Sequence, residues 1–383
     1  MIGLRAQAGP LFVEAGPGFT FSGGPKDTLA KVVSTEPTTE PTPSITAGQR
    51  AIAMEQPEQR SARSIALASV RPNPAPGLQL DTITGLPIRR QWDSNWGYCG
   101  ETSLIAAGMS LGQYASQFTV RQLASPGLEQ TEQESQLLLG VNDENAATRM
   151  HLAASVYSPS SAPQGTQRKN RFIAWISDRL QAGSRVILGV YIRGEHDTEY
   201  DHILPALNVQ TSSSGSNRND QSSDRLVFTD NYGQVLNATF RKLLRTRRMA
   251  NSTTAPPYSI PRGTRNYGLA ISGVADPDQV TIPVHLEANR DNEPDLAEAA
   301  QQPPEPEPLK LQATVLIPDQ EQSYNVYRYD DFSKVPELNF NAAAANAIQS
   351  WVIPPHSGDA IHYELDVFTD ANVIFRAVPS TAP

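Results

Sequence analysis

The amino-acid sequence predicts an α+β domain followed by a separate all-β module. Helical apolar spacing within residues 104–181 comes before a series of β-like runs that starts at residue 185. Acidic, Pro-rich sequence then fills residues 288–308, and alternating apolar and polar residues follow over residues 309–383. Helices followed by an antiparallel meander are typical of an α+β domain. The last segment indicates a small β-sandwich-like module.

The predicted helices depend on the spacing of apolar residues. Residues 104–112 have helical spacing and open a longer stretch to Leu123, and residues 145–156 have it again. The clearest amphipathic helix is residues 171–181, and Gly183 is expected to end it as a C-cap. Its apolar face is made of Phe172, Trp175, Ile176 and Leu180.

Four strands are predicted in the first domain. They are residues 185–192, 202–209, 225–229 and 267–274. A Ser- and Asn-rich loop separates the second strand from the third, which ends at a polar pair followed by a turn glycine.

Composition divides the chain into four segments. Residues 1–84 are rich in Gly, Pro, Thr and Ser and are expected to be either a flexible low-complexity segment or a pro-segment. Residues 85–287 form the predicted α+β domain, residues 288–308 an extended acidic linker, and residues 309–383 the β-module.

Charge and hydropathy exclude some function classes. A net charge of -9 and a pI near 5.2 argue against nucleic acid or an anionic membrane as the main partner. The basic run at 241–248 is expected to be a solvated helix face. No apolar stretch approaches the roughly 18 residues that span a bilayer, and the first residues lack the apolar core of a secretory signal. A single cysteine suits the reducing cytoplasm, which is slightly favoured, although an extracellular protein without disulfides would look the same.

Cys99 is the only cysteine, so it cannot form an internal disulfide. It lies between an aromatic, Gly-containing loop and an apolar stretch that begins at Leu104 and is expected to be helical. Unpaired N–H groups at a helix N-terminus lower the pKa of a thiol, which would make Cys99 a nucleophile. The alternative is an inert, buried cysteine that packs as a small apolar residue.

A thiol nucleophile needs a base, and the base needs an orienting acceptor. Among six histidines, His202 begins a predicted strand of the same domain. Either Asp230 or Asn231, at the end of the next predicted strand, is placed to accept the imidazole N–H. Asp201 is expected to lie on the surface, and Glu101 to interact with the first turn of the helix. No cluster has the spacing of a zinc site, so no metal and no cofactor are predicted.

Residues 88–275 resemble the papain-like cysteine peptidase superfamily, and the Cys-Gly-Glu-Thr-Ser sequence from Cys99 looks closest to its C39-like branch. The resemblance implies a papain-like catalytic domain in which Cys99 is the nucleophile and His202 the general base and acid. It makes Asp230 the orienting residue and Gln91 the side-chain donor of the oxyanion hole.

Two positions depart from the family pattern. Gln91 lies eight residues before Cys99, a wider gap than usual, so Asn95 remains an alternative oxyanion donor. Papain-like peptidases commonly use Asn as the third residue and the C39-like branch uses Asp. The position directly after the strand favours Asp230 over Asn231.

The expected function is hydrolysis of a peptide, isopeptide or other amide bond through an acyl-enzyme, with a peptide or protein as substrate. Two alternatives stay open: a transglutaminase-like acyl transferase, which uses the same order of Cys, His and Asp, and a non-enzymatic binding protein on a papain-like scaffold. The sequence does not indicate an oligomeric state.

Overall fold

The computed structural model describes residues 72–74, 91, 97–157, 166–196, 198–210, 221–288, 309–355, 358–367 and 371–380. The chain divides into two compact units. Of the described residues, the first contains residues 91 and 97–108 and those between 117 and 275, and the second contains residues 72–74 and 109–116 and those between 276 and 380. The predicted linker at 288–308 lies almost wholly outside the described residues, as does the N-terminal segment apart from strand β1 (Pro72–Pro74).

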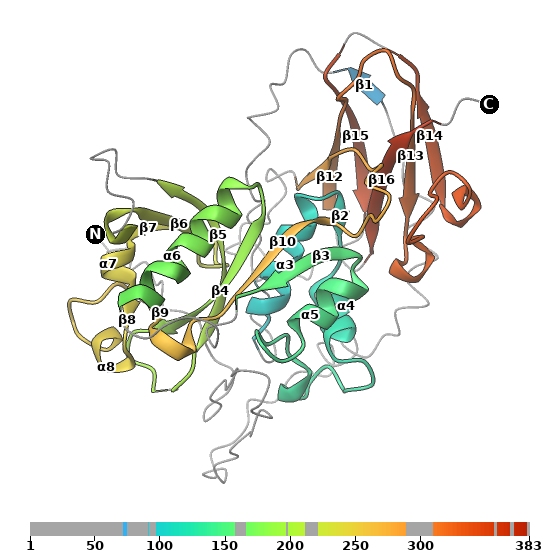
Figure 1. Ribbon diagram of the computed structural model, residues 1–383. Helices are drawn as coiled ribbons and strands as arrows, with labels where there is room; N and C mark the ends of the chain where they lie inside the picture. The colour runs from blue at the N-terminus through green and yellow to red at the C-terminus, as the bar shows by residue number, and fades with distance from the viewer. Residues whose placement is uncertain are drawn as a thin grey trace, which may run out of the picture. The chain divides into compact units, whose positions relative to one another are not determined.

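The first unit combines helices with one large sheet (Figure 1). Its described α-helices are α3 (Cys99–Met109), whose last residue belongs to the second unit, α4 (Gln117–Ala124), α5 (Asp143–Arg149), α6 (Thr166–Gln181), α7 (Phe240–Leu243) and α8 (Arg247–Ala250). Short 3₁₀ turns lie at η2 (Gln133–Ser135), η4 (Gln221–Ser223) and η5 (Gly263–Arg265).

Eight strands form the sheet of this unit. Its main path runs in the order β3 (Leu152–Val156), β10 (Gly268–Val274), β4 (Arg185–Ile192), β5 (His202–Gln210), β6 (Arg225–Thr229) and β7 (Val235–Thr239). All neighbours on this path are antiparallel. Off the path, β9 (Tyr258–Pro261) pairs with β4 and, in parallel, with β8 (Leu244–Arg245). The sheet therefore lays β5 beside both β4 and β6, so the ends of the two strands expected to carry catalytic residues are neighbours.

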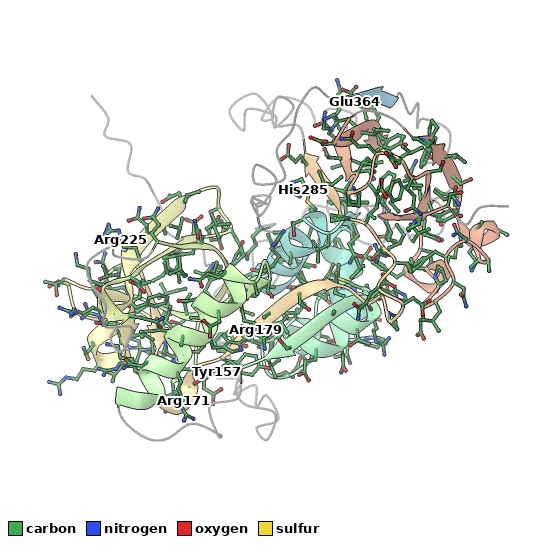
Figure 2. The ribbon with its side chains drawn as sticks, turned by 45° about the horizontal axis from the view of Figure 1, so that its top comes forward. Tyr157, Arg171, Arg179, Arg225, His285 and Glu364 are labelled. Atoms are coloured by element: carbon green, nitrogen blue, oxygen red, sulfur yellow. The ribbon has the colours of Figure 1, made fainter. Side chains whose placement is uncertain are left out.

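Helix α6 covers one face of this sheet because its apolar side chains recur at helical spacing. Phe172, Ile173 and Ile176 are fully buried against residues of β4 and β5. Tyr157, labelled in Figure 2 with Arg171 and Arg179 of α6, lies with its ring 4.7 Å from that of Phe172. Each large apolar side chain buried in this way contributes about 1.5–3 kcal/mol.

The second unit is all-β in the residues described. One four-stranded sheet has the order β1, β15 (Ala360–Val367), β12 (Leu309–Leu316) and β11 (Val284–Ala288). The other has the order β14 (Gln349–Ile353), β13 (Tyr324–Tyr329), β16 (Val373–Pro379) and β2 (Gln113–Tyr114). Short 3₁₀ turns lie at η7 (Phe332–Lys334) and η8 (Ala344–Asn346). The Trp351 ring joins the two sheets, since it lies 5.1 Å from Tyr363 of β15 and 6.1 Å from Phe375 of β16.

Strand β2 comes from the chain directly after α3, far in sequence from the rest of its sheet. It pairs with β16, and Gly112 accepts a hydrogen bond from the N–H of Phe375 (2.7 Å). The buried Arg376 donates to Gln113 Oε1 (2.8 Å). Gly112 has a φ of +78°, and a Cβ there would lie 2.8 Å from Val284, so the turn into β2 needs glycine.

The prediction of a mixed α+β chain with antiparallel sheets is confirmed. The strands predicted at 185–192 and 225–229 are β4 and β6, and Gly183 ends α6 with a φ of +80°. The helix predicted over 145–156 is wrong in its second half, because α5 stops at Arg149 and β3 pairs with β10. Cross-strand pairing there outweighs the local spacing.

Three further predictions differ from the structure. The helical stretch predicted to reach Leu123 is interrupted by β2, and the basic run at 241–248 divides into α7, β8 and α8. The expected domain boundary near 287 differs from the unit boundary after Ala275, because β11 pairs with β12. In the described part of the chain, none of the helices has the length and apolar character needed to cross a membrane.

Candidate functional site

Cys99 is the first residue of α3, as predicted. The first helical hydrogen bond runs from Thr102 N to Tyr98 O (2.9 Å), and the Ser103 hydroxyl donates to the Cys99 carbonyl (2.7 Å). The Cys99 side chain is buried, with 7% of its surface exposed. The thiol therefore lies at the N-terminal end of an 11-residue helix and within the protein interior.

Gly100 lies against the loop that contains Leu137. A Cβ atom at position 100 would lie 2.3 Å from the backbone oxygen of Leu137, a contact that a real Cβ does not make. The glycine after the cysteine is therefore required by the close approach of two backbone segments.

Asn231 connects the cysteine helix to the sheet. Its Nδ2 lies 3.2 Å from the carbonyl oxygen of Cys99, 3.0 Å from Ser103 Oγ and 2.9 Å from the carbonyl oxygen of Ile203. Its backbone has a φ of +63°, a conformation that Asn tolerates better than most residues. Gln91 also contacts Asn231, because its backbone N–H donates to the Asn231 carbonyl (2.7 Å).

His202 is buried at the start of β5, with 3% of its surface exposed. Its ring stacks on Tyr232 at 5.9 Å and on Tyr258 at 5.7 Å. The Nε2 atom lies 3.2 Å from the carbonyl oxygen of Asp230. A carbonyl only accepts, so Nε2 carries the proton of the neutral ring and Nδ1 is its basic nitrogen.

Burial lowers the pKa of His202 to about 4, although the hydrogen bond to the Asp230 carbonyl acts in the opposite direction. The imidazole is consequently neutral at pH 7. A neutral ring is the form that a general base requires.

The hydrogen bond between His202 and Asp230 involves the backbone carbonyl of Asp230. Its carboxylate Oδ1 accepts from the N–H groups of Tyr232 (2.8 Å) and Gln234 (3.0 Å), which closes the turn after β6. The prediction that the Asp230 side chain orients the imidazole remains a prediction. The contact described is with the carbonyl.

Burial, and to a smaller extent the charge of Glu101, raise the pKa of the Cys99 thiol to about 12. Hydrogen bonds from the N–H groups of Ile203 and Gly100 act in the opposite direction, as does Arg121. At pH 7 the thiol is therefore protonated. The N–H of Ile203, the residue that directly follows His202, is one of the groups that hydrogen-bond to the thiol.

A buried ion pair joins the first turn of α3 to α4. Arg121 Nε is 2.7 Å from Glu101 Oε1, and both side chains are completely buried. Sequence reasoning expected Glu101 to act on its own helix turn and did not identify Arg121. The apolar spacing around Arg121 in α4 resembles that of any amphipathic helix, so no signal in the sequence marked this pair.

Asp201, predicted to lie on the surface, is buried instead. Its Oδ2 accepts from the N–H of Ile192 (2.6 Å), and the carboxylate forms an ion pair with Arg247 of α8. The Arg247 guanidinium also lies 4.1 Å from the centre of the Tyr191 ring. These contacts hold the loop before His202 against β4.

Asn231 thus contacts both Cys99 and the backbone of Gln91, and His202 contacts the backbone of Asp230, the residue before Asn231. The alternative oxyanion residue, Asn95, lies outside the described residues. Among the side chains that are described, no group of His, Cys, Asp and Glu has the arrangement of a metal site. Comparisons of the chain with protein-family models, with curated proteins and with solved structures find no match.

Proposed function

We propose that this protein is a papain-like cysteine hydrolase that cleaves an amide bond, with Cys99 as nucleophile and His202 as base. One observation carries the proposal: the start of α3 contacts the residues that directly follow the base and its acceptor. Ile203 follows His202 and donates its N–H to the thiol, and Asn231 follows Asp230 and donates to the Cys99 carbonyl. Nucleophile, base and acceptor therefore occupy one region of the first unit.

The protonation states favour general-base catalysis over a preformed ion pair. A neutral thiol and a neutral imidazole start the reaction, and the proton of Sγ passes to Nδ1 of His202 as sulfur attacks the carbonyl carbon. Collapse of the tetrahedral intermediate breaks the C–N bond, and Nδ1 returns that proton to the leaving amine. Water then attacks the thioester and gives a proton to Nδ1, which restores the thiol as the acid departs.

Gln91 is the proposed oxyanion donor together with the N–H of Cys99. Its backbone N–H donates to the carbonyl of Asn231, and its side-chain Nε2 would be the donor to the oxyanion. One oxyanion donor typically contributes about 3 kcal/mol to lowering the barrier.

A specific observation favours the non-enzymatic alternative. The thiol is buried, and its pKa is raised to about 12, so it is protonated at pH 7. A binding protein on the same scaffold requires no reactive thiol. The test must therefore measure whether the histidine activates the sulfur.

The decisive experiment is the rate of Cys99 alkylation by iodoacetamide between pH 5 and 9, in the native protein and in His202→Ala. Activation predicts that His202→Ala reacts at least about tenfold more slowly at pH 7. His285→Ala is the matched control, because His285 is equally buried but belongs to the second unit. Equal alkylation rates in the native protein, His202→Ala and His285→Ala would contradict the hydrolase proposal and favour the non-enzymatic binding protein. Ammonia release from a glutamine donor with amine incorporation would instead identify an acyl transferase.

A further inference from the structure

The buried Glu101–Arg121 pair holds both sides of the cysteine. Arg121 donates from Nη1 to the carbonyl of Gln130 (3.2 Å) and from Nη2 to the carbonyl of Gly97, two residues before Cys99. Glu101, two residues after Cys99, accepts from the N–H of Leu137 through the same oxygen that meets Arg121 (3.1 Å). The chain is therefore fixed immediately before and after the thiol.

The same guanidinium lies 3.5 Å from the centre of the Tyr98 ring, whose side chain is completely buried. Tyr98 is the residue next to Cys99, and its ring also packs 5.9 Å from Phe118 of α4. Arg121 thus contacts the residue that sets the direction in which the chain enters α3.

We propose that the Glu101–Arg121 pair is a positioning device for the Cys99 nucleophile, which fixes the chain on both sides of the sulfur and sets the charge around it. The inference rests on the proposed role of Cys99. Glu101 and Arg121 would act on the nucleophile in two ways, by holding the backbone on either side of it and by their charges. Neither residue would contact the substrate.

Stability alone does not account for the pair. A buried ion pair often contributes nothing net to folding, because removing two charges from water costs about as much as their attraction returns. Here one oxygen of the carboxylate, Glu101 Oε2, is also buried without a hydrogen-bond partner among the described residues. Burial accordingly raises the pKa of Glu101, while Arg121 lowers it.

Two opposed charges act on the thiol. The carboxylate of Glu101 raises the pKa of Cys99, and the guanidinium of Arg121 lowers it. Tyr200, from the segment before β5, is a further titratable group that interacts with the thiol. Burial raises the pKa of Tyr200 well above its ordinary value, so it stays neutral in the accessible range. The remaining described partners, Asn231, Ile203 and Gly100, carry no charge.

The test uses the single cysteine of the full chain. Protein labelled with ¹³C at the cysteine Cβ gives one resonance that reports thiol protonation, and iodoacetamide rates at pH 7–9.5, below the midpoint of the wild type, rise in proportion to the thiolate fraction and compare the variants independently. In Glu101→Gln the midpoint is expected to fall by about one pH unit, with a rise of about tenfold in alkylation rate at fixed pH. Adding Arg121→Met to Glu101→Gln is expected to move the midpoint back towards that of the wild type.

A purely structural pair predicts something different. Loosening the loop would expose the thiol in both variants, and both midpoints would move to the ordinary value near 8.5. That result, or an unchanged midpoint in Glu101→Gln, overturns the proposal. If Glu101→Gln does not fold, the double variant is the test, since replacement of both charged partners is generally tolerated. A midpoint near that of the wild type supports the proposal, and a midpoint near 8.5 contradicts it. The control is Lys334→Met with Asp330→Asn, which removes an ion pair of the second unit and is expected to leave the midpoint unchanged.

Neither measurement needs a substrate. If the midpoint shifts in Glu101→Gln as expected but the protein hydrolyses no amide substrate, only the proposed function is contradicted. If the midpoint does not shift in Glu101→Gln, only the role of the pair is contradicted.

Discussion

Asn231 donates a hydrogen bond to the backbone carbonyl of Cys99 although 132 residues separate them in the chain. The same amide nitrogen bonds Ser103 on α3 and Ile203 on β5. This side chain therefore joins the cysteine helix to the strand that begins with His202, and several expected properties of the protein depend on that region.

Substitution of Asn231 is expected to destabilise the first unit. Asn231→Ala removes the hydrogen bonds of the amide, whose two N–H donors are shared among three acceptors and contribute about 1 kcal/mol each, and it adds about 1 kcal/mol for an alanine at positive φ. Asn231→Gly removes the same hydrogen bonds without the backbone strain, so it is expected to be the milder change. Urea unfolding measures both. Equal stabilities for the two variants would show that the positive φ has no energetic cost.

Buried His202 makes stability depend on pH. Its pKa is about 4 in the folded protein against 6.5 for an exposed histidine, so the unfolded chain binds the extra proton between these values. Stability from the neutral ring is fully present above about pH 6.5 and is lost as pH falls towards 4, by about 3 kcal/mol in total. His202→Gln, which cannot titrate, is expected to flatten this slope in unfolding measurements from pH 4 to 7. A slope that survives the substitution would assign the effect to other groups.

Gly100→Ala is expected to cost at least about 2 kcal/mol, because the added methyl group overlaps the carbonyl oxygen of Leu137. Gly273→Ala is the matched control: nothing lies within 4 Å of a Cβ built there, so its effect is expected to stay within about 0.5 kcal/mol. The shift in melting temperature of the two variants checks this. The Gly100 variant should also alkylate faster as the loop moves away from Cys99.

Removal of residues 276–383 is expected to release β2. Tyr114 is 2% exposed in the whole protein, in a strand whose described partner is β16. Limited digestion with chymotrypsin should therefore cleave after Tyr114 in the shortened chain and leave it intact in the whole protein. Tyr191, 1% exposed at the end of β4, is the internal control and should resist in both. A protected Tyr114 in the shortened chain would show that the segment is held without β16.

Local sequence patterns predicted the strands and the helix that build the main core. Residues 185–192 are apolar almost throughout because β4 lies between β5 and β10, and α6 carries its apolar face at helical spacing. Cys99, His202 and Asp230 all belong to the first unit, whereas the roles that the sequence assigns to them remain predictions.

Long-range contacts could not be predicted in the same way. The partner of Glu101 is Arg121 on the next helix, and nothing in either local pattern indicates the other. Asn231 was weighed only as an imidazole acceptor, because a side-chain bond to a helix 132 residues away leaves no periodic signal. Strand β2 is two residues long and is defined by its partner alone.

The pairing of β2 with β16 also constrains the order in which the protein can assemble during its synthesis. Residues 113–114 leave the ribosome more than 250 residues before residue 373, and the whole of the first unit's sheet is made in the interval. Such distant pairing is slow to form, whereas domains generally fold as they emerge. The sheet of the unit that contains the cysteine can therefore form before the last strand is made, whereas Gln113 and Tyr114, which follow α3 closely, cannot pair with β16 until residue 373 has been synthesised.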